Sequence, residues 1–166
     1  MTGGWPESRG VGRPAVGSAL ETALFFSLLF TGLAMSAAGA HLLELLSKLS
    51  WPRDEYMIVQ QIYRGWALLG IVVVAALLAT LVAVILGRRQ RLVMSLALVA
   101  LSSLAGAQAI FWLLTYPVNQ KTRDWTAVPA DWLGLRLQWE YSHAAGAMLD
   151  LAAFIALILA ALARRH

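Results

Sequence analysis

The sequence lacks cysteine and contains few charged residues. Without a single cysteine among 166 residues, the chain has no disulfide bonds, thiolate metal sites, covalent haem attachment or thiol redox chemistry. This also excludes a small four-helix carrier that passes electrons from dithiols to quinones. Charged residues make up 13% of the chain, against roughly 25% in soluble domains. With 60% hydrophobic residues and a mean hydropathy of +0.68, the composition predicts an integral membrane protein.

Four long uncharged runs account for most of the chain. A crossing needs about 20 apolar residues to span about 30 Å of hydrocarbon. Lipid cannot satisfy open backbone groups, so runs of this length predict helices rather than barrel strands. We expect an all-α fold, a four-transmembrane-helix bundle over residues 18–166, with spans near residues 20–43, 65–87, 92–116 and 143–163. Residues 1–17, with five Gly and two Pro, are predicted to be a flexible N-terminal tail.

The positions of the charges predict how the bundle is oriented. One side carries seven basic residues on short segments, namely Arg9, Arg13, Arg88, Arg89, Arg91, Arg164 and Arg165. The connections on the other side, residues 44–64 and 117–142, hold six basic and six acidic residues. The positive-inside rule therefore predicts cytoplasmic termini and an extended helical and aromatic cap outside, in a multi-pass protein of the cell (plasma or inner) membrane. Because the basic residues lie at segment ends, nucleic acid is excluded as a partner.

Aromatic residues gather in the predicted outer half. They comprise six of the seven tryptophans and all four tyrosines, namely Trp51, Trp66, Trp112, Trp125, Trp132, Trp139, Tyr56, Tyr63, Tyr116 and Tyr141. An interfacial aromatic belt explains such residues in most membrane proteins, but a belt normally forms at both interfaces. The imbalance leaves two interpretations open, a belt alone or a belt together with an aromatic-lined pocket.

The outer connections contain helix signals. Ser50 is placed to cap a helix that opens at Trp51 and continues as the second span, and the fourth helix is expected to begin after Asp131. The residues that recur on this fourth helix at steps of three and four are Arg136, Glu140, His143, Ala147 and Asp150. They share one face, and we expect that face to point into the bundle because charge is costly against lipid.

Two short motifs bring carboxylates and imidazoles to similar depth. His41 and Glu44 leave the first span, and Glu140 and His143 enter the fourth, each pair at i, i+3 spacing. Such pairs on neighbouring helices are candidate metal ligands for Fe, Mn, Zn or Cu. Alternatively, His41 and His143 are the axial ligands of a haem. In the structural alternative, Glu140 pairs with Arg136 and the histidines bond to tryptophan or to backbone.

The third connection and the fourth helix resemble a known family. The run 115–119 (TYPVN), the run 124–126 (DWT) and the run 139–144 (WEYSHA) are similar to the anthrone oxygenase-like family of four-helix integral membrane proteins, also called the domain of unknown function 1772 family. The resemblance covers about residues 110–150. It implies a four-helix bundle whose relatives oxidise tricyclic anthrones with molecular oxygen. By position, Pro117 and Asn119 would shape the outer turn, and Trp139 and His143 would line the site.

Two function hypotheses follow. In the first, the chain is a cofactor-free or metal-dependent oxygenase or oxidoreductase acting on a lipophilic aromatic or quinone-like compound. His143 is then the base or ligand, Asn119 or Arg136 stabilises an oxyanion, and tryptophans such as Trp139 stack on the substrate. In the second, it is a non-catalytic membrane subunit that docks a partner protein, a second copy, or a pigment or haem through its tryptophan-rich cap. A transporter with Glu21 and Asp150 on a proton path is a weaker third hypothesis, because no inverted repeat is evident.

Overall fold

The computed structural model describes residues 15–63 and 65–164, and every regular element in these two ranges is helical. This part of the chain holds four helices that are long and apolar enough to cross a membrane. They contain α1 (Ala15–Ser50), α3 (Leu69–Gly87), α4 (Arg91–Ile110) and α6 (Trp132–Ala163). The predicted all-helical chain with four candidate spans is confirmed. Residues 1–14 of the predicted tail, and Arg165, lie outside the described residues, whereas residues 15–17 belong to α1.

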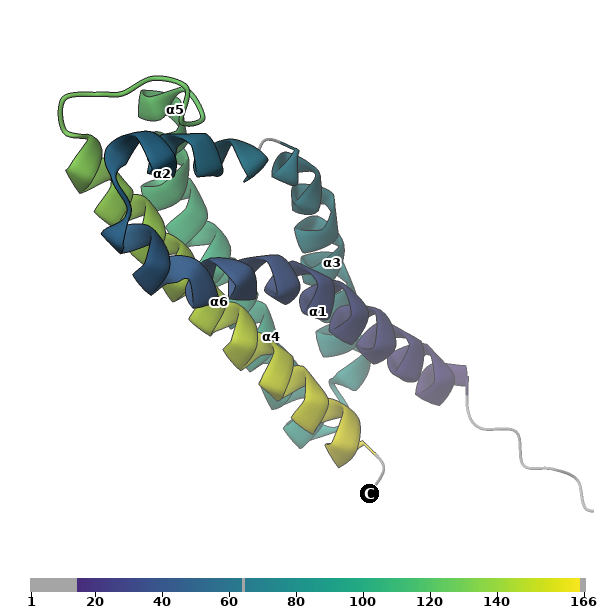
Figure 1. The fold of residues 1–166 in the computed structure, drawn as a ribbon. Helices are drawn as coiled ribbons and strands as arrows, with labels where there is room; N and C mark the ends of the chain where they lie inside the picture. The colour runs from purple at the N-terminus through teal and green to yellow at the C-terminus, as the bar shows by residue number, and fades with distance from the viewer. Residues whose placement is uncertain (1–14, 64, 165–166) are drawn as a thin grey trace, which may run out of the picture.

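The four long helices pack as a closed ring. Helix α1 contacts α3 and α6, and α4 contacts the same two helices (Figure 1). A tight turn, in which Gln90 N–H donates to the Gly87 carbonyl at 2.8 Å, joins α3 to α4. At the same end of the bundle, the Arg164 guanidinium pairs with Glu21 at 2.6 Å and donates to the Gly17 carbonyl. These contacts bring the start of α1 and the end of α6 together.

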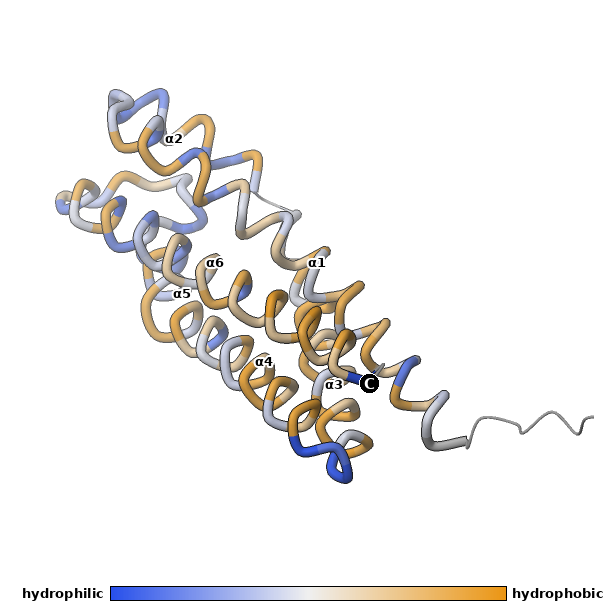
Figure 2. The backbone as a smooth tube through the Cα atoms, turned by 90° about the horizontal axis from the view of Figure 1, so that it is seen from below, coloured by the Kyte–Doolittle hydropathy of each residue, from blue (hydrophilic) through white to orange (hydrophobic). Residues whose placement is uncertain are grey.

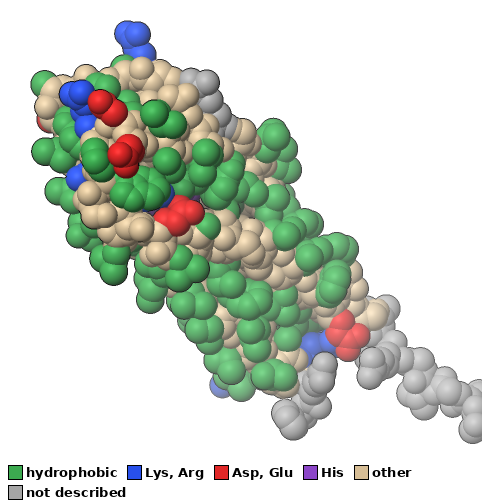
Figure 3. Space-filling model, viewed as in Figure 1, with side chains coloured by type: hydrophobic (Ala, Val, Ile, Leu, Met, Phe, Trp, Pro, Cys, Tyr) green, Lys and Arg blue, Asp and Glu red, His purple; other side chains and the backbone are tan. Residues whose placement is uncertain are grey.

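The outer surface of the bundle is apolar and its interior positions are small. Hydrophilic backbone segments gather at the two ends of the tube in Figure 2, and hydrophobic side chains cover most of the length between them in Figure 3. Helix α3 exposes Ile71, Val74, Leu78, Val82 and Ile85. The residues that it buries are Ala76, Thr80, Ala83 and Gly87. Helices that associate within lipid show this pattern, with large apolar residues on the outer surface and small residues between the helices.

Two glycines allow neighbouring helices to approach α6 closely. A Cβ atom added at Gly106 of α4 would lie 3.3 Å from Leu149 Cδ1, and one added at Gly32 of α1 would lie 3.4 Å from Phe154 Cε2. An added methyl group would meet Phe154 at ordinary contact distance and Leu149 slightly closer than that, so neither position has spare room. Within a membrane the hydrophobic effect does not drive helices together, and small residues let them pack closely enough for van der Waals contacts to do so.

A short helix closes one end of the bundle. Helix α2 (Arg53–Gln60) is followed by the 3₁₀ turns η1 (Gln61–Tyr63) and η2 (Trp66–Leu68), and it lies across the bundle between α1 and α3 (Figure 1). The predicted continuous helix from Trp51 into the second span is therefore wrong. Ser50 does not cap α2, because its hydroxyl donates back to the Ser47 carbonyl at 2.7 Å.

The chain between α4 and α6 departs from regular helix twice. Helix α4 continues through a π-helical turn, η3 (Phe111–Thr115), into α5 (Tyr116–Thr122). Pro117 has no N–H to donate to the preceding turn, and such a gap in the hydrogen-bond ladder favours local widening. After α5, three consecutive residues have positive φ, namely Arg123 (48°), Asp124 (53°) and Trp125 (63°). Helix α6 then begins directly after Asp131, as predicted.

The small buried positions of α6 yield a stability prediction. Ala153 is fully buried and Ala152 beside it is exposed. We expect Ala153→Leu to lower the free energy of unfolding by about 1–3 kcal/mol, because the added methylenes overpack the helix interface. Ala152→Leu, the matched control, should leave it almost unchanged. Thermal unfolding in detergent micelles measures both, and equal effects of the two changes would contradict the packing described here.

Candidate functional site

A cavity of about 1120 Å³ lies between the long helices at the end covered by α2. Its polar lining consists of His41, Gln60, Gln108, Asn119, Ser142, His143 and Asp150, with Arg123, Asp124 and Thr residues 115 and 126 beside them. Its aromatic lining consists of Tyr63, Trp66, Phe111, Trp112, Tyr116, Trp125 and Trp139. Of the two interpretations of the aromatic residues, the structure supports a belt together with a pocket, because Trp112 and Tyr141 also have large exposed areas.

The two histidines of the cavity are far along their helices from the Glu21–Arg164 pair. His41 follows Glu21 by 20 residues on α1, and His143 precedes Arg164 by 21 residues on α6. At 1.5 Å per residue, both separations are about 30 Å, which is the thickness of the hydrocarbon layer. The two histidines therefore lie at matching positions along α1 and α6, about one hydrocarbon thickness from that pair.

The structure brings the two predicted histidines together. The ring centroids of His41 and His143 lie 4.3 Å apart, although the residues come from the first and last helices. Trp139 packs against both, with centroid distances of 5.0 Å to His41 and 3.9 Å to His143. Asn119 fixes the indole, because its Oδ1 accepts a hydrogen bond of 2.8 Å from Trp139 Nε1. Four of the predicted site residues thus form one wall of the cavity.

The neighbours of the two imidazoles assign different tautomers to them. His143 Nδ1 lies 2.9 Å from the Trp139 carbonyl oxygen, which can only accept, so Nδ1 carries the proton and Nε2 keeps its lone pair. His41 Nδ1 lies 3.5 Å from the Lys48 ammonium, which can only donate. Its proton is therefore on Nε2. The pair combines one acceptor nitrogen, on His143, with one donor nitrogen, on His41.

Lys48 is the central residue that sequence reasoning missed. Its side chain is 1% exposed, and its Nζ lies 2.9 Å from Glu44 Oε2 and 3.9 Å from Glu140 Oε1. It also donates to Tyr63 Oη at 2.5 Å. The sequence does indicate that Lys48 belongs with the motif, because His41, Glu44 and Lys48 follow one another at steps of three and four and so share one face of α1.

Glu140 is held by donors from α2. Its carboxylate is 1% exposed and accepts from Tyr56 Oη at 2.9 Å and from Gln60 Nε2 at 3.1 Å. Arg136, predicted to pair with Glu140 or to stabilise an oxyanion, instead donates to the Trp51 carbonyl at 2.9 Å. Its side chain is absent from the lining of the cavity. Arg136 therefore anchors the corner between α1 and α2, and the prediction that it acts on substrate is not supported.

The predicted metal and haem ligand sets do not fit this geometry. Across residues 15–63 and 65–164, no group of three or more His, Asp and Glu side chains is arranged to hold a metal ion. The Lys48 ammonium provides the positive charge that Glu44 and Glu140 need, so it occupies the role predicted for a metal. The His41 and His143 rings contact each other directly, whereas axial ligands of a haem stand on opposite faces of the macrocycle.

The remaining charged candidates lie apart from the imidazole pair. Asp150 is half-buried and lines the cavity two turns further along α6, together with Gln108 from α4. Glu21 lies at the other end of the bundle, where it pairs with Arg164. A single proton path that joins Glu21 to Asp150 is therefore not supported by the packing of the chain.

Two tyrosines beside the cavity are held in the neutral form. Burial raises the pKa of Tyr63 above its ordinary value of 10, and the hydrogen bond that it donates to Glu44 at 2.6 Å raises the pKa further. Burial, together with the neighbouring Glu140 carboxylate, likewise raises the pKa of Tyr56. Both phenols therefore stay protonated over the physiological range and act as donors to the two carboxylates.

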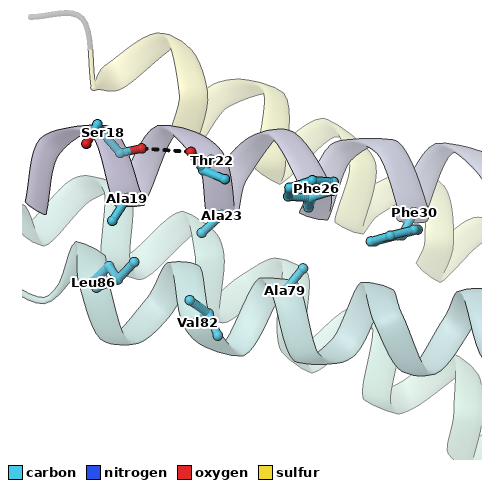
Figure 4. A pocket seen from close by; sticks show the side chains of 9 residues that line it. All are labelled: Ser18, Ala19, Thr22, Ala23, Phe26, Phe30, Ala79, Val82 and Leu86. Atoms are coloured by element: carbon cyan, nitrogen blue, oxygen red, sulfur yellow. Dashed lines mark hydrogen bonds between the residues drawn. The ribbon is translucent and has the colours of Figure 1, made fainter. Parts of the chain in front are cut away.

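A second hollow of about 630 Å³ lies between the N-terminal half of α1 and the C-terminal half of α3 (Figure 4). Its lining is apolar apart from Ser18 and Thr22, and the Thr22 hydroxyl donates to the Ser18 carbonyl at 3.0 Å. No titratable side chain is among its lining residues, all of which lie in the described part of the chain. The candidate chemistry therefore belongs to the cavity with the histidines.

Comparison of the chain with family models, with curated proteins and with solved structures found no match. The resemblance to the anthrone oxygenase-like family therefore stays a prediction that depends on the residues quoted for it above.

The Lys48 cluster yields a prediction about stability. Lys48→Met should lower the free energy of unfolding by about 3–5 kcal/mol, because it leaves the buried Glu140 carboxylate without its cation. The double variant Lys48→Met with Glu140→Gln should recover much of the loss, since it removes both charges. Lys121→Met, at an exposed lysine, serves as the control. Chemical unfolding in micelles measures the three variants, and a double variant no more stable than Lys48→Met would contradict the assigned pairing.

Proposed function

We propose that this protein is a membrane oxidoreductase that binds a lipophilic aromatic or quinone-like compound in the cavity and removes a proton from it through His143. The observation that carries the proposal is the imidazole pair, whose ring centroids lie 4.3 Å apart in the lining of a largely apolar cavity. The tautomers inferred above give this pair one acceptor nitrogen and one donor nitrogen. Apolar cavities with a few convergent polar groups are the usual form of small-molecule sites.

The pair matches the chemistry of a phenolic or enolic hydroxyl. Such a group donates its proton to His143 Nε2 and accepts from the Nε2–H of His41. When the proton moves to His143, the His41 N–H is aimed at the oxyanion that forms, which lowers the barrier to its formation. The anion gives up electrons more readily than the neutral compound. Molecular oxygen is the electron acceptor that the family resemblance implies.

The surroundings of the pair support a flat, apolar ligand. Trp139, Trp66 and Phe111 provide ring faces, and Val73 and Val74 of α3 provide aliphatic surface. A compound dissolved in the bilayer would reach the cavity at the depth where the two histidines lie.

Docking of a partner protein through the cap is supported less well. Three of the aromatic residues at this end, Tyr56, Trp125 and Trp139, are buried inside the chain, although Trp112 and Tyr141 are exposed. Residues buried in this way are able to line an internal site, but they do not present an anchor to a second protein.

We further propose that both termini are cytoplasmic and that α2 and α5 form an outer cap. The support is the charge distribution. Arg88, Arg89 and Arg91 lie at the turn between α3 and α4, at the same end as Arg164, and basic residues on short segments favour the cytoplasmic side. The connections at the other end, residues 44–64 and 117–142, carry equal numbers of basic and acidic residues.

Single-cysteine labelling tests this orientation without background, because the chain has no cysteine. Gln90→Cys lies in the turn between α3 and α4, and Ala130→Cys lies in the loop before α6, and both positions are exposed. In intact cells, an impermeant maleimide should label Ala130→Cys at once and Gln90→Cys only after permeabilisation. The reverse pattern would show that the orientation is inverted.

The role of His143 is tested with anthrone as the probe substrate. His143→Ala should lower the rate of oxygen consumption by a factor of about 10²–10⁴, because the general base is lost. Tyr141→Phe, an exposed position on the same helix, is the matched control and should keep the full rate. Circular dichroism confirms that both variants fold. A folded His143→Ala variant with full activity would refute the assignment.

A further inference from the structure

We infer that the cavity contains a second polar subsite, formed by the Trp125 indole N–H and the Gln60 side-chain carbonyl, that holds a second hydroxyl of the ligand. The inference rests on the proposed function, since it takes the imidazole pair as the site of the first hydroxyl. It narrows the ligand to a flat aromatic compound with one hydroxyl on each of two opposite edges.

Two buried polar atoms carry the inference. Trp125 is 3% exposed and Gln60 is 2% exposed, and both residues line the cavity. Within the described residues, neither Trp125 Nε1 nor Gln60 Oε1 has a hydrogen-bond partner. Buried polar groups in folded proteins are almost always hydrogen-bonded. Of the buried atoms left without a partner, Trp125 Nε1 and Gln60 Oε1 belong to residues of the cavity lining, and we take them as the donor and the acceptor for one ligand group.

The orientation of the Gln60 amide is set by its other contact. Its Nε2 donates to Glu140 Oε1, and a carboxylate can only accept, so the amide nitrogen must face Glu140. The carbonyl oxygen is therefore the atom left to accept a bond from another group. Glu140 is itself tied to Lys48 and Tyr56, which makes this orientation part of the charged cluster.

Trp125 is held in place by neighbouring rings and by its backbone. Its ring lies edge-on to Tyr56 at 5.1 Å and to Trp139 at 5.9 Å. Its backbone N–H donates to Thr122 Oγ1 at 3.2 Å, at the end of the turn with three positive φ angles. Strained backbone of this kind persists where the surroundings over-determine it, as they do at ligand sites.

Trp139 connects the two ends of the proposed site. Its ring contacts His41 and His143 of the imidazole pair and also Trp125 of the second subsite. The two polar ends are thus neighbours of one indole, and we infer that a single flat ligand reaches both. A hydroxyl suits each end, because it accepts from one donor and donates to one acceptor. At the second end it accepts from Trp125 Nε1–H and donates to Gln60 Oε1. A ketone oxygen would satisfy Trp125 alone.

The test compares two probes on the full chain in detergent micelles, by isothermal titration calorimetry. 2-Naphthol has one hydroxyl, and 2,6-dihydroxynaphthalene has a second on the opposite edge of the same ring system. We expect the second hydroxyl to tighten binding about fivefold. In Trp125→Phe, which keeps a ring and removes the N–H, this gain should disappear while the affinity for 2-naphthol is kept. Trp132→Phe, at a tryptophan outside the cavity lining, is the control and should keep the gain.

A measurement on the unchanged chain keeps the inference testable if Trp125→Phe does not fold. The indole ¹⁵N–¹H resonance of Trp125 should shift on binding of 2,6-dihydroxynaphthalene and stay in place with 2-naphthol. Equal affinities for the two probes, or a gain that persists in Trp125→Phe, would overturn the second subsite alone. Failure of 2-naphthol to bind, or binding that is unchanged by His143→Ala, would overturn the proposed function as well.

Discussion

The pairing of the buried Lys48 ammonium is the interaction on which the cap and the candidate site depend. The ammonium lies near the end of α1 and contacts Glu44 on its own helix, Tyr63 of η1 and Glu140 of α6. An unpaired charge at a site that is 1% exposed would cost several kcal/mol, roughly 3–5 by comparison with broken buried pairs. These groups are therefore held together as a unit, and the unit joins three segments that are far apart in the sequence.

This charge cluster also shapes the chemistry of the cavity. Because Lys48 faces Nδ1 of His41, the proton of that imidazole is on the nitrogen away from the ammonium, whereas the Trp139 carbonyl imposes the opposite tautomer on His143. Two side chains of the same type thus acquire different roles through their neighbours. Glu140 extends the cluster to Gln60, whose orientation follows from it. The proposed roles of His41 and of the Gln60 carbonyl therefore both depend on this charge cluster, whereas that of His143 depends on the Trp139 carbonyl.

The sequence predicts the bundle well because the bilayer imposes simple rules. The length of the apolar runs predicts the four helices, and the position of Asp131 predicts the start of α6. The cost of charge in lipid predicts which face of α6 points inward. The separate helix α2 does not follow, because Ser50 bonds within α1 rather than capping the next helix. Whether Ser50 caps the next helix or bonds within α1 depends on tertiary packing over the end of the bundle.

Part of the candidate site is predictable from the sequence, because helix geometry fixes the spacing of its residues. Helical spacing places His41 and His143 at one depth, and the structure brings their rings together. The partners of the carboxylates were misjudged because a lysine at a membrane boundary normally extends toward water and is taken as an orienting charge. Only the three-dimensional arrangement reveals that Lys48 turns inward and takes the role predicted for a metal ion, and that Arg136 bonds to backbone instead of to Glu140.

The most direct test of this account is ¹⁵N nuclear magnetic resonance of the imidazoles in histidine-labelled protein. The account predicts that His41 carries its proton on Nε2 and His143 on Nδ1, and that replacing Lys48 removes the preference at His41 alone. The same tautomer at both residues, or no response of His41 to the loss of Lys48, would contradict it.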